Sequence, residues 1–89
     1  MRYEIHVSKR GSIGFELLRF DCALLIYWPD TYNNELLNER RALSDEMRAW
    51  MVEQFDPDGD WAFDDKSVNT TRVYFMDAKD MMLFKLRWA

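Results

Sequence analysis

The C-terminal segment TTRVYFMDAKDMMLFKLRWA constrains the fold of this chain more than any other part of it. Residues 69–76 alternate their side chains in the manner of a β-strand. Asp77 follows at once and is a favourable N-cap for a helix. In that helix Phe84 and Trp88 lie one turn apart, so we expect them to pack against the sheet. The segment therefore predicts a strand that runs directly into a capped helix.

Two further patterns lie near the N-terminus. Residues 2–8 alternate polar and apolar side chains and predict a half-buried strand. Residues 13–17 alternate again, which favours a second strand that forms a hairpin with the first. The apolar residues of this region also fall near one helical face, so a helix over residues 15–27 is a second interpretation. Pro29 ends either element, because the residue before a proline is steered away from helical geometry.

A helix over residues 44–55 is the clearest internal element. Ser44 is a good N-cap, and the apolar residues after it recur on one face at helical spacing. The preceding residues 33–43 are polar apart from a Leu-Leu pair, and they fit either a short helix or an ordered loop. Residues 61–63 alternate once more and predict a short strand.

Together these elements predict a single α+β domain over residues 1–89. The expected sheet is small and mostly antiparallel, with three or four strands and two or more helices packed on one face. A chain of 89 residues buries a modest core, but an aromatic content of 16% supplies large side chains to fill it.

The cysteine content and the length of the apolar runs indicate the cellular compartment of this protein. Cys22 is the only cysteine, so the chain forms no internal disulfide and no cysteine zinc site. The N-terminal residues lack the apolar core of a signal peptide. The longest purely apolar run, residues 22–28, is far shorter than a membrane span. We therefore expect a cytoplasmic protein that needs no cofactor and contacts no membrane.

The net charge of −4 conceals a strong asymmetry along the chain. Residues 1–41 balance six acids with six bases, whereas residues 42–65 carry eight acids against Arg48 alone, a net charge of −7. Residues 66–89 carry a net charge of +3. The acidic middle would repel phosphate, so direct binding of nucleic acid is not expected.

The acidic middle also suggests a function. Concentrated acids can steer a domain onto a basic patch of another protein, and they can equally form a solvated surface. Our leading hypothesis is a non-enzymatic interaction module whose partner is a protein with a basic patch. The candidate contact residues are Asp45, Glu46, Glu53, Asp56, Asp58, Asp60, Trp61, Asp64 and Asp65.

The loop Asp56-Pro57-Asp58-Gly59-Asp60 is the one candidate metal site. Its three aspartates occupy the first, third and fifth positions of a helix-loop-helix calcium loop. That loop needs glycine at its sixth position and glutamate at its twelfth, where this chain has Trp61 and Ser67. A β-turn is therefore the favoured interpretation, and a divalent-cation-binding protein is the third functional hypothesis.

Catalytic groups are sparse in this sequence. His6 and Cys22 are the only pair that resembles a base and a nucleophile, and no third group that would orient His6 is identifiable. We therefore predict no enzyme. The alternative function is a structural protein, such as a virion or oligomer building block. Its expected contact surfaces are the apolar residues 24–28 and the C-terminal tail, where Trp and Arg are of the types enriched at binding hot spots.

The C-terminal residues DAKDMMLFKLRW resemble the C-termini of small uncharacterised proteins of tailed bacteriophages. Those proteins tend to end in a strand, an acidic-Ala pair, a Phe shortly afterwards, and Leu-Arg-Trp. In this chain both Asp77-Ala78 and Asp80-Met81 could correspond to that pair. The resemblance covers the last quarter of the chain and implies no activity. It implies a short phage-encoded protein made in a bacterial cytoplasm, either a virion part or a modifier of host machinery.

Overall fold

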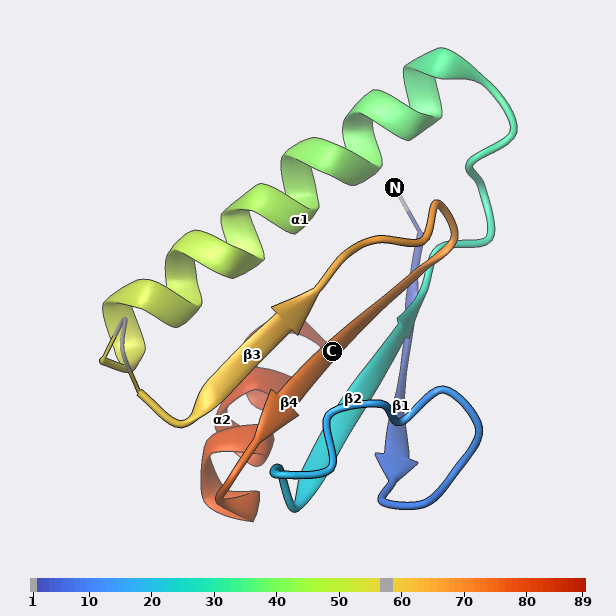
Figure 1. Cartoon of the computed structure of the whole chain (residues 1–89). Helices are drawn as coiled ribbons and strands as arrows, with labels where there is room; N and C mark the ends of the chain where they lie inside the picture. The colour runs from blue at the N-terminus through green and yellow to red at the C-terminus, as the bar shows by residue number, and fades with distance from the viewer. Residues whose placement is uncertain (1, 57–58) are drawn as a thin grey trace.

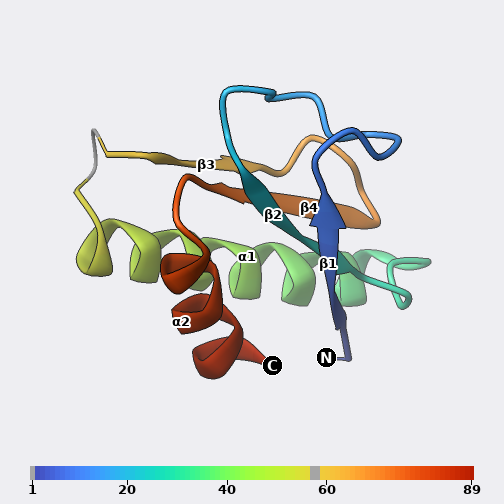
Figure 2. The same ribbon diagram turned by 90° about the horizontal axis from the view of Figure 1, so that it is seen from below.

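Residues 2–56 and 59–89 are described by a computed structural model of the chain (Figure 1). Within them the elements follow the order β1 (Glu4–Lys9), β2 (Cys22–Tyr27), α1 (Asn34–Gln54), β3 (Trp61–Asp64), β4 (Thr70–Phe75) and α2 (Ala78–Trp88). The strands form one antiparallel sheet in the order β1-β2-β4-β3. Both helices lie on the same face of this sheet (Figure 2). The predicted α+β class is confirmed, with four strands and two helices in the described residues.

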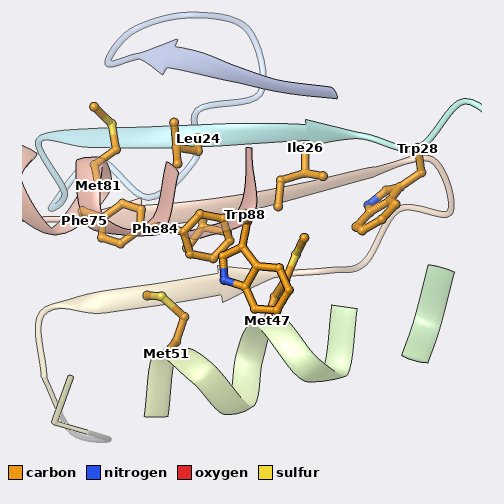
Figure 3. Close-up of a cluster of buried hydrophobic side chains, with 10 residues drawn as sticks. Leu24, Ile26, Trp28, Met47, Met51, Phe75, Met81, Phe84 and Trp88 are labelled. Atoms are coloured by element: carbon orange, nitrogen blue, oxygen red, sulfur yellow. The ribbon is translucent and has the colours of Figure 1, made fainter. Parts of the chain in front are cut away.

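The main hydrophobic core lies between the sheet and the two helices (Figure 3). Side chains from both central strands and both helices meet there, namely Leu24, Ile26, Val73, Phe75, Met47, Met51, Phe84 and Trp88. Phe84 is fully buried and Trp88 is only 8% exposed, which confirms that the C-terminal helix packs against the sheet. Full burial of one such side chain contributes about 1.5–3 kcal/mol to folding.

The opposite face of the sheet is partly covered by residues 10–21, which connect β1 to β2 (Figure 2). Phe15 and Phe20 from this connection pack around Tyr74 of β4, with ring centroids 5.1 and 5.6 Å from that of the tyrosine. Ala23 of β2 is buried in this cluster, whereas Leu25 is half-buried and Tyr27 is 38% exposed on the same face. β2 is therefore covered on its core face and only in part on the other.

The strand predicted over residues 13–17 is wrong, and so is the alternative helix over 15–27. β1 forms its antiparallel pair with β2 instead. Gly14 sets the path of the connection, because it has a φ of +86°, and a Cβ there would lie 2.5 Å from Nη1 of Arg72. The Arg72 guanidinium donates to the Gly14 carbonyl. The alternation in this stretch thus belongs to a loop held against the sheet.

α1 begins at Asn34, so the predicted start at Ser44 is also wrong. Asn33 is the N-cap, and its Oδ1 accepts a hydrogen bond from the Leu36 N–H at 2.9 Å. Ser44 lies in mid-helix and is 1% exposed. Arg40 and Ser44 occupy buried positions where an amphipathic helix normally carries apolar residues. These two polar residues interrupt the helical spacing of apolar residues in the sequence, so the first half of α1 lacks a clear helical pattern.

α2 agrees closely with its prediction. Asp77 is its N-cap, and the carboxylate accepts from the Lys79 N–H at 2.9 Å. The Tyr3 hydroxyl donates to the Trp88 carbonyl, which fastens the C-terminal turn to the start of β1. Neither helix in the described part of the chain combines the length and apolar character needed to cross a membrane.

Candidate functional site

The predicted contact residues of α1 and the following connection do not form a single surface. Glu46 and Glu53 lie along one side of α1 and are exposed. Asp45 is also exposed, but it projects about 100° away from Glu46 around the helix. Asp56 and Asp60 are exposed in the connection that follows the helix. The acidic middle of the sequence is therefore spread around α1 and beyond its C-terminal end.

The predicted contact residues of β3 are more closely tied to the fold. Trp61 is half-buried, and its Nε1 donates to the Asp56 carbonyl at 2.9 Å. Asp64 is half-buried and lies opposite Arg72 in the β3–β4 register. These two side chains point to opposite faces of the sheet, since neighbours three apart in a strand alternate.

Asp65 is the centre of a polar cluster inside the fold. Its Oδ1 accepts from Arg40 Nη2 at 2.5 Å and from the Thr71 hydroxyl at 2.6 Å. Its Oδ2 accepts from the Ser44 hydroxyl at 2.6 Å. The Thr71 oxygen in turn accepts from Trp28 Nε1 at 2.9 Å. Both carboxylate oxygens are therefore occupied within the chain.

Arg40 joins α1 to the turn between β3 and β4. The residue is only 2% exposed. Its Nε donates to the Val68 carbonyl at 3.1 Å, and its Nη2 donates to the Ser67 carbonyl at 2.9 Å. The guanidinium carbon also lies 5.1 Å from the centroid of the Trp28 ring. Since a buried charge is tolerated only when it is paired and hydrogen-bonded, we assign the Arg40–Asp65 cluster to holding α1 against the sheet.

This cluster makes the stability of the fold sensitive to acid. Burial alone would raise the pKa of Asp65, but hydrogen bonds from Arg40, Ser44 and Thr71, with the charge of Arg40, hold that pKa below its ordinary value. Such a carboxylate stabilises the fold above its unfolded pKa of about 3.9, and the contribution is lost as the pH falls through the lower folded value. We expect the urea concentration at the unfolding midpoint to decrease as the pH is lowered from about 5, until the pH lies below the folded pKa of Asp65.

The variant Asp65→Asn isolates this contribution from that of the other carboxylates. It should be less stable than the wild type at neutral pH, and its urea midpoint should fall less over the same acid range. Urea titrations followed by tryptophan fluorescence measure both quantities. If the urea midpoints of the wild type and of Asp65→Asn decrease equally with falling pH, Asp65 does not contribute to the acid sensitivity.

The exposed side of α1 carries a row of four glutamates. Its members are Glu35, Glu39, Glu46 and Glu53, and all four are exposed. They are spaced by four, seven and seven residues. At 3.6 residues per turn these spacings place all four side chains within about 40° of one another around the helix. We call these four residues the glutamate ridge.

No base in the helix compensates the glutamate ridge. Positions three and four residues from each member hold no lysine or arginine. Within residues 2–56 and 59–89, no member takes part in an ion pair. Glu35 and Glu39 are like charges one turn apart, and Glu53 lies in the last turn, which contains no base. The Glu35–Glu39 repulsion weakens the helix by about 0.2–0.5 kcal/mol, and Glu53 at the negative end of the helix dipole weakens it by about 0.3–1 kcal/mol, whereas Glu35 in the first turn suits the positive end of the dipole.

A shallow hollow of about 310 Å³ lies in the middle of the glutamate ridge. Glu39 and Glu46 border it, and Ala42 and Leu43 complete its lining. Carboxylates beside an apolar floor suit a lysine or arginine side chain. The aliphatic stem of such a residue packs on apolar atoms, while its charged end hydrogen-bonds to the carboxylates.

The sequence did not single out Glu35 and Glu39, because its clearest helical pattern starts at Ser44 and residues 33–43 fit either a short helix or a loop. The available signal was the seven-residue spacing of Glu39, Glu46 and Glu53. Residues at that spacing drift by only about 20° per heptad around a helix, so they share one side of it. The capping potential of Asn33, a residue type as favourable as serine, would have extended the helix to include them.

Two of the three aspartates of the candidate metal site lie within the described residues. Asp56 and Asp60 lie in the same connection, whereas Asp58 is outside the described residues. The Asp56 carbonyl accepts from the Gly59 N–H at 2.8 Å as well as from Trp61. In the described part of the chain, no three His, Cys, Asp or Glu side chains come together as a metal-binding group.

The fold separates the two candidate catalytic residues. In the β1–β2 register His6 lies opposite Leu25, whereas Cys22 lies opposite Lys9. His6 and Cys22 therefore point to opposite faces of the sheet. Burial raises the pKa of the Cys22 thiol, and nearby aspartates raise it further. A thiol with a raised pKa is a poor nucleophile near neutral pH, because little of it is ionised.

A groove on the far side of β3 has mixed charge. Its volume is about 410 Å³. Its lining contains both acids and bases, namely Glu16, Asp64, Asp65, Arg48 and Lys66. It therefore offers no uniform field to a partner of one sign.

The apolar residues expected to contact other subunits have two different locations. Leu24, Ile26 and Trp28 are fully buried, so the expected surface over residues 24–28 is wrong. These side chains belong to the core beneath the helices. The C-terminal helix, in contrast, leaves part of its surface apolar and exposed, with Leu86 at 78%.

Comparison with known proteins found no family model, no curated protein and no solved structure that matches this chain. The function must therefore be inferred from the residues of the chain itself.

Proposed function

We propose that this chain is a non-enzymatic interaction module that binds a basic patch of another protein through the glutamate ridge. The observation that carries this proposal is a row of four exposed glutamates with no base beside them. The repulsion between Glu35 and Glu39 and the place of Glu53 at the negative end of the helix dipole both oppose helix formation, so we infer a role outside the fold for this row. Solvation alone would be served as well by mixed charges.

The glutamate ridge would act first by attracting its partner over distance. From Glu35 to Glu53 it extends about 27 Å along the helix, at about 1.5 Å per residue. The Debye length is about 10 Å at 0.1 M salt, so neighbouring charges of the ridge add to one field. Such a field accelerates the encounter with a basic patch and orients it along the helix.

The hollow between Glu39 and Glu46 would then receive one lysine or arginine of the partner. Asp56, Asp60 and Trp61 extend the surface beyond the C-terminal end of α1. Asp65 is left out of the binding surface because Arg40, Ser44 and Thr71 occupy its carboxylate. We place this activity in a bacterial cytoplasm, as that of a phage-encoded modifier of host machinery, on the resemblance of the C-terminal residues.

A pair of matched variants tests the proposed binding surface. The ridge variant replaces Glu39, Glu46 and Glu53 with lysine, and the matched variant replaces the exposed acids Glu4, Glu16 and Asp21 with lysine. Both changes turn the net charge from −4 to +2. The probe is a fluorescent peptide of arginine and alanine, measured by anisotropy at low salt. We expect the ridge variant to lose at least about tenfold in affinity and the matched variant less than about threefold.

The stability of the ridge variant separates lost binding from lost structure. Its thermal midpoint should equal or exceed that of the wild type, because Glu53→Lys suits the negative end of the helix dipole and Glu39→Lys removes the repulsion from Glu35. Equal losses of affinity in both variants would show that only net charge matters. Affinity that is independent of salt would contradict electrostatic steering.

A further inference from the structure

The outer side of α2 is apolar although it faces away from the sheet. Phe84 and Trp88 point into the core from the other side of the same helix. Met82, Leu83 and Leu86 are 47%, 49% and 78% exposed. We call these three residues the α2 stripe. A helix that is apolar on two sides is normally covered on both, so the α2 stripe requires an occupant.

The surface of the α2 stripe is shallow and continuous. A hollow of about 510 Å³ follows it, lined by Ala78, Lys79, Met82, Leu83 and Leu86. Lys79 is the one lining residue with a polar side chain. The stripe therefore offers a seam of apolar contacts about two helical turns long.

Charges of opposite sign border the α2 stripe at its two ends. Asp80 and Arg87 are seven residues apart, so they lie on the same flank of the stripe. In the part of the chain that the structure describes, neither residue forms an ion pair. The Arg87 guanidinium instead lies over the ring of its neighbour Trp88, at 4.1 Å from the centroid. Arg87 is exposed and Asp80 is half-buried, so each retains some surface for an external group.

The α2 stripe and its two bordering charges are self-complementary under a two-fold rotation. If two α2 helices pack antiparallel, the flank of one meets the same flank of the other with its ends exchanged. Asp80 of each copy then faces Arg87 of the second copy, and the pair occurs twice by symmetry. In a parallel arrangement the two-fold axis would run along the helices and place these flanks on opposite sides of the contact, so no Asp80–Arg87 pair would form. Antiparallel packing also aligns the two helix dipoles favourably.

We propose that the α2 stripe is the interface between two copies of this chain, packed antiparallel around Leu83. This inference does not depend on the glutamate ridge, which lies on α1. A lipid surface would leave the complementary placement of Asp80 and Arg87 unused, and it is the other occupant that the experiments below test. α2 is about 16 Å long, so the contact is smaller than the roughly 800 Å² per partner of standard interfaces. We therefore expect a reversible dimer with a dissociation constant on the order of 10–100 μM.

Sedimentation equilibrium over a wide range of protein concentrations tests the dimer. The wild type should change from monomer to dimer as its concentration rises, whereas Leu86→Glu should stay monomeric and keep its thermal midpoint, since Leu86 is 78% exposed. A wild type that is monomeric at several hundred micromolar, or a Leu86→Glu variant that dimerises equally well, would overturn the proposal.

Charge exchange tests the antiparallel orientation. Asp80→Arg and Arg87→Glu should each weaken the dimer about tenfold or more, and the double variant should restore it. Thermal unfolding shows that the single variants are folded. A double variant as weak as either single variant would contradict the orientation. Flotation with phosphatidylglycerol vesicles completes the test: vesicle binding that Leu86→Glu abolishes, without self-association of the wild type, would assign the stripe to a membrane surface instead.

Discussion

Arg40→Ala is expected to lower the free energy of unfolding by about 3–5 kcal/mol, the usual effect of removing one partner from a buried ion pair. The change leaves the half-buried Asp65 carboxylate without its cation. It also deprives the carbonyls of Ser67 and Val68 of their donor. Because domains of this size are stable by about 5–15 kcal/mol in total, the variant should be close to unfolded at moderate urea concentrations.

Arg41→Ala is the control for this prediction. Arg41 is the next residue of α1 but is exposed, and its replacement should change stability by no more than about 0.5 kcal/mol. Urea unfolding followed by both tryptophan fluorescence and far-ultraviolet circular dichroism measures the two variants side by side. Similar midpoints for Arg40→Ala and Arg41→Ala would show that the Arg40–Asp65 cluster contributes little to the fold.

Phe84→Ala is expected to lower the free energy of unfolding by about 3–5 kcal/mol, the range for truncating a buried aromatic residue. Phe84 is fully buried. Its ring centroid lies 5.8 Å from that of Trp50, 6.1 Å from that of Phe75 and 6.3 Å from that of Trp88. The change would therefore leave a cavity where α1, α2 and the sheet all meet, which none of the three can fill alone.

Val52→Ala is the matched truncation on an exposed helix surface. Val52 is 43% exposed, so its replacement should change stability by less than about 0.5 kcal/mol. If Phe84→Ala costs no more than Val52→Ala, α2 is not the element that closes the core. A large loss in Phe84→Ala would show that the C-terminal helix belongs to the cooperative unit of the fold.

The sequence predicted the elements in which local signals and burial agree. The segment from β4 to α2 is one of them, because alternation, the Asp77 cap and the apolar face all indicate the same structure. The strand predicted in the connection between β1 and β2 was wrong because the local pattern and the burial disagree there. Its alternating residues are divided between Phe15, which is buried against Tyr74, and Ile13, which is fully exposed at 100%. Only the tertiary structure decides which apolar residues of such a loop are covered.

The start of α1 could not be predicted from apolar periodicity alone. Arg40 is a core residue of this fold, but it is buried through long-range bonds to residues 65–71, which the local sequence does not show. Because the helix start was predicted ten residues too late, the sequence also failed to group the glutamates of α1 into one surface. Once the helix is extended to Asn34, Glu35 and Glu39 join Glu46 and Glu53 on one side. Asp65 is half-buried, and hydrogen bonds within the chain occupy its carboxylate.

Affinity capture from a bacterial lysate at low salt tests the glutamate ridge most directly. Three immobilised proteins are compared by quantitative mass spectrometry: the wild type, the Glu39/Glu46/Glu53→Lys variant, and the Glu4/Glu16/Asp21→Lys variant of equal net charge. We expect basic proteins that the wild type and the matched variant both retain, and that the ridge variant loses. Retention of the same proteins by the ridge variant, or their equal loss from both variants, would contradict a binding surface on this side of α1.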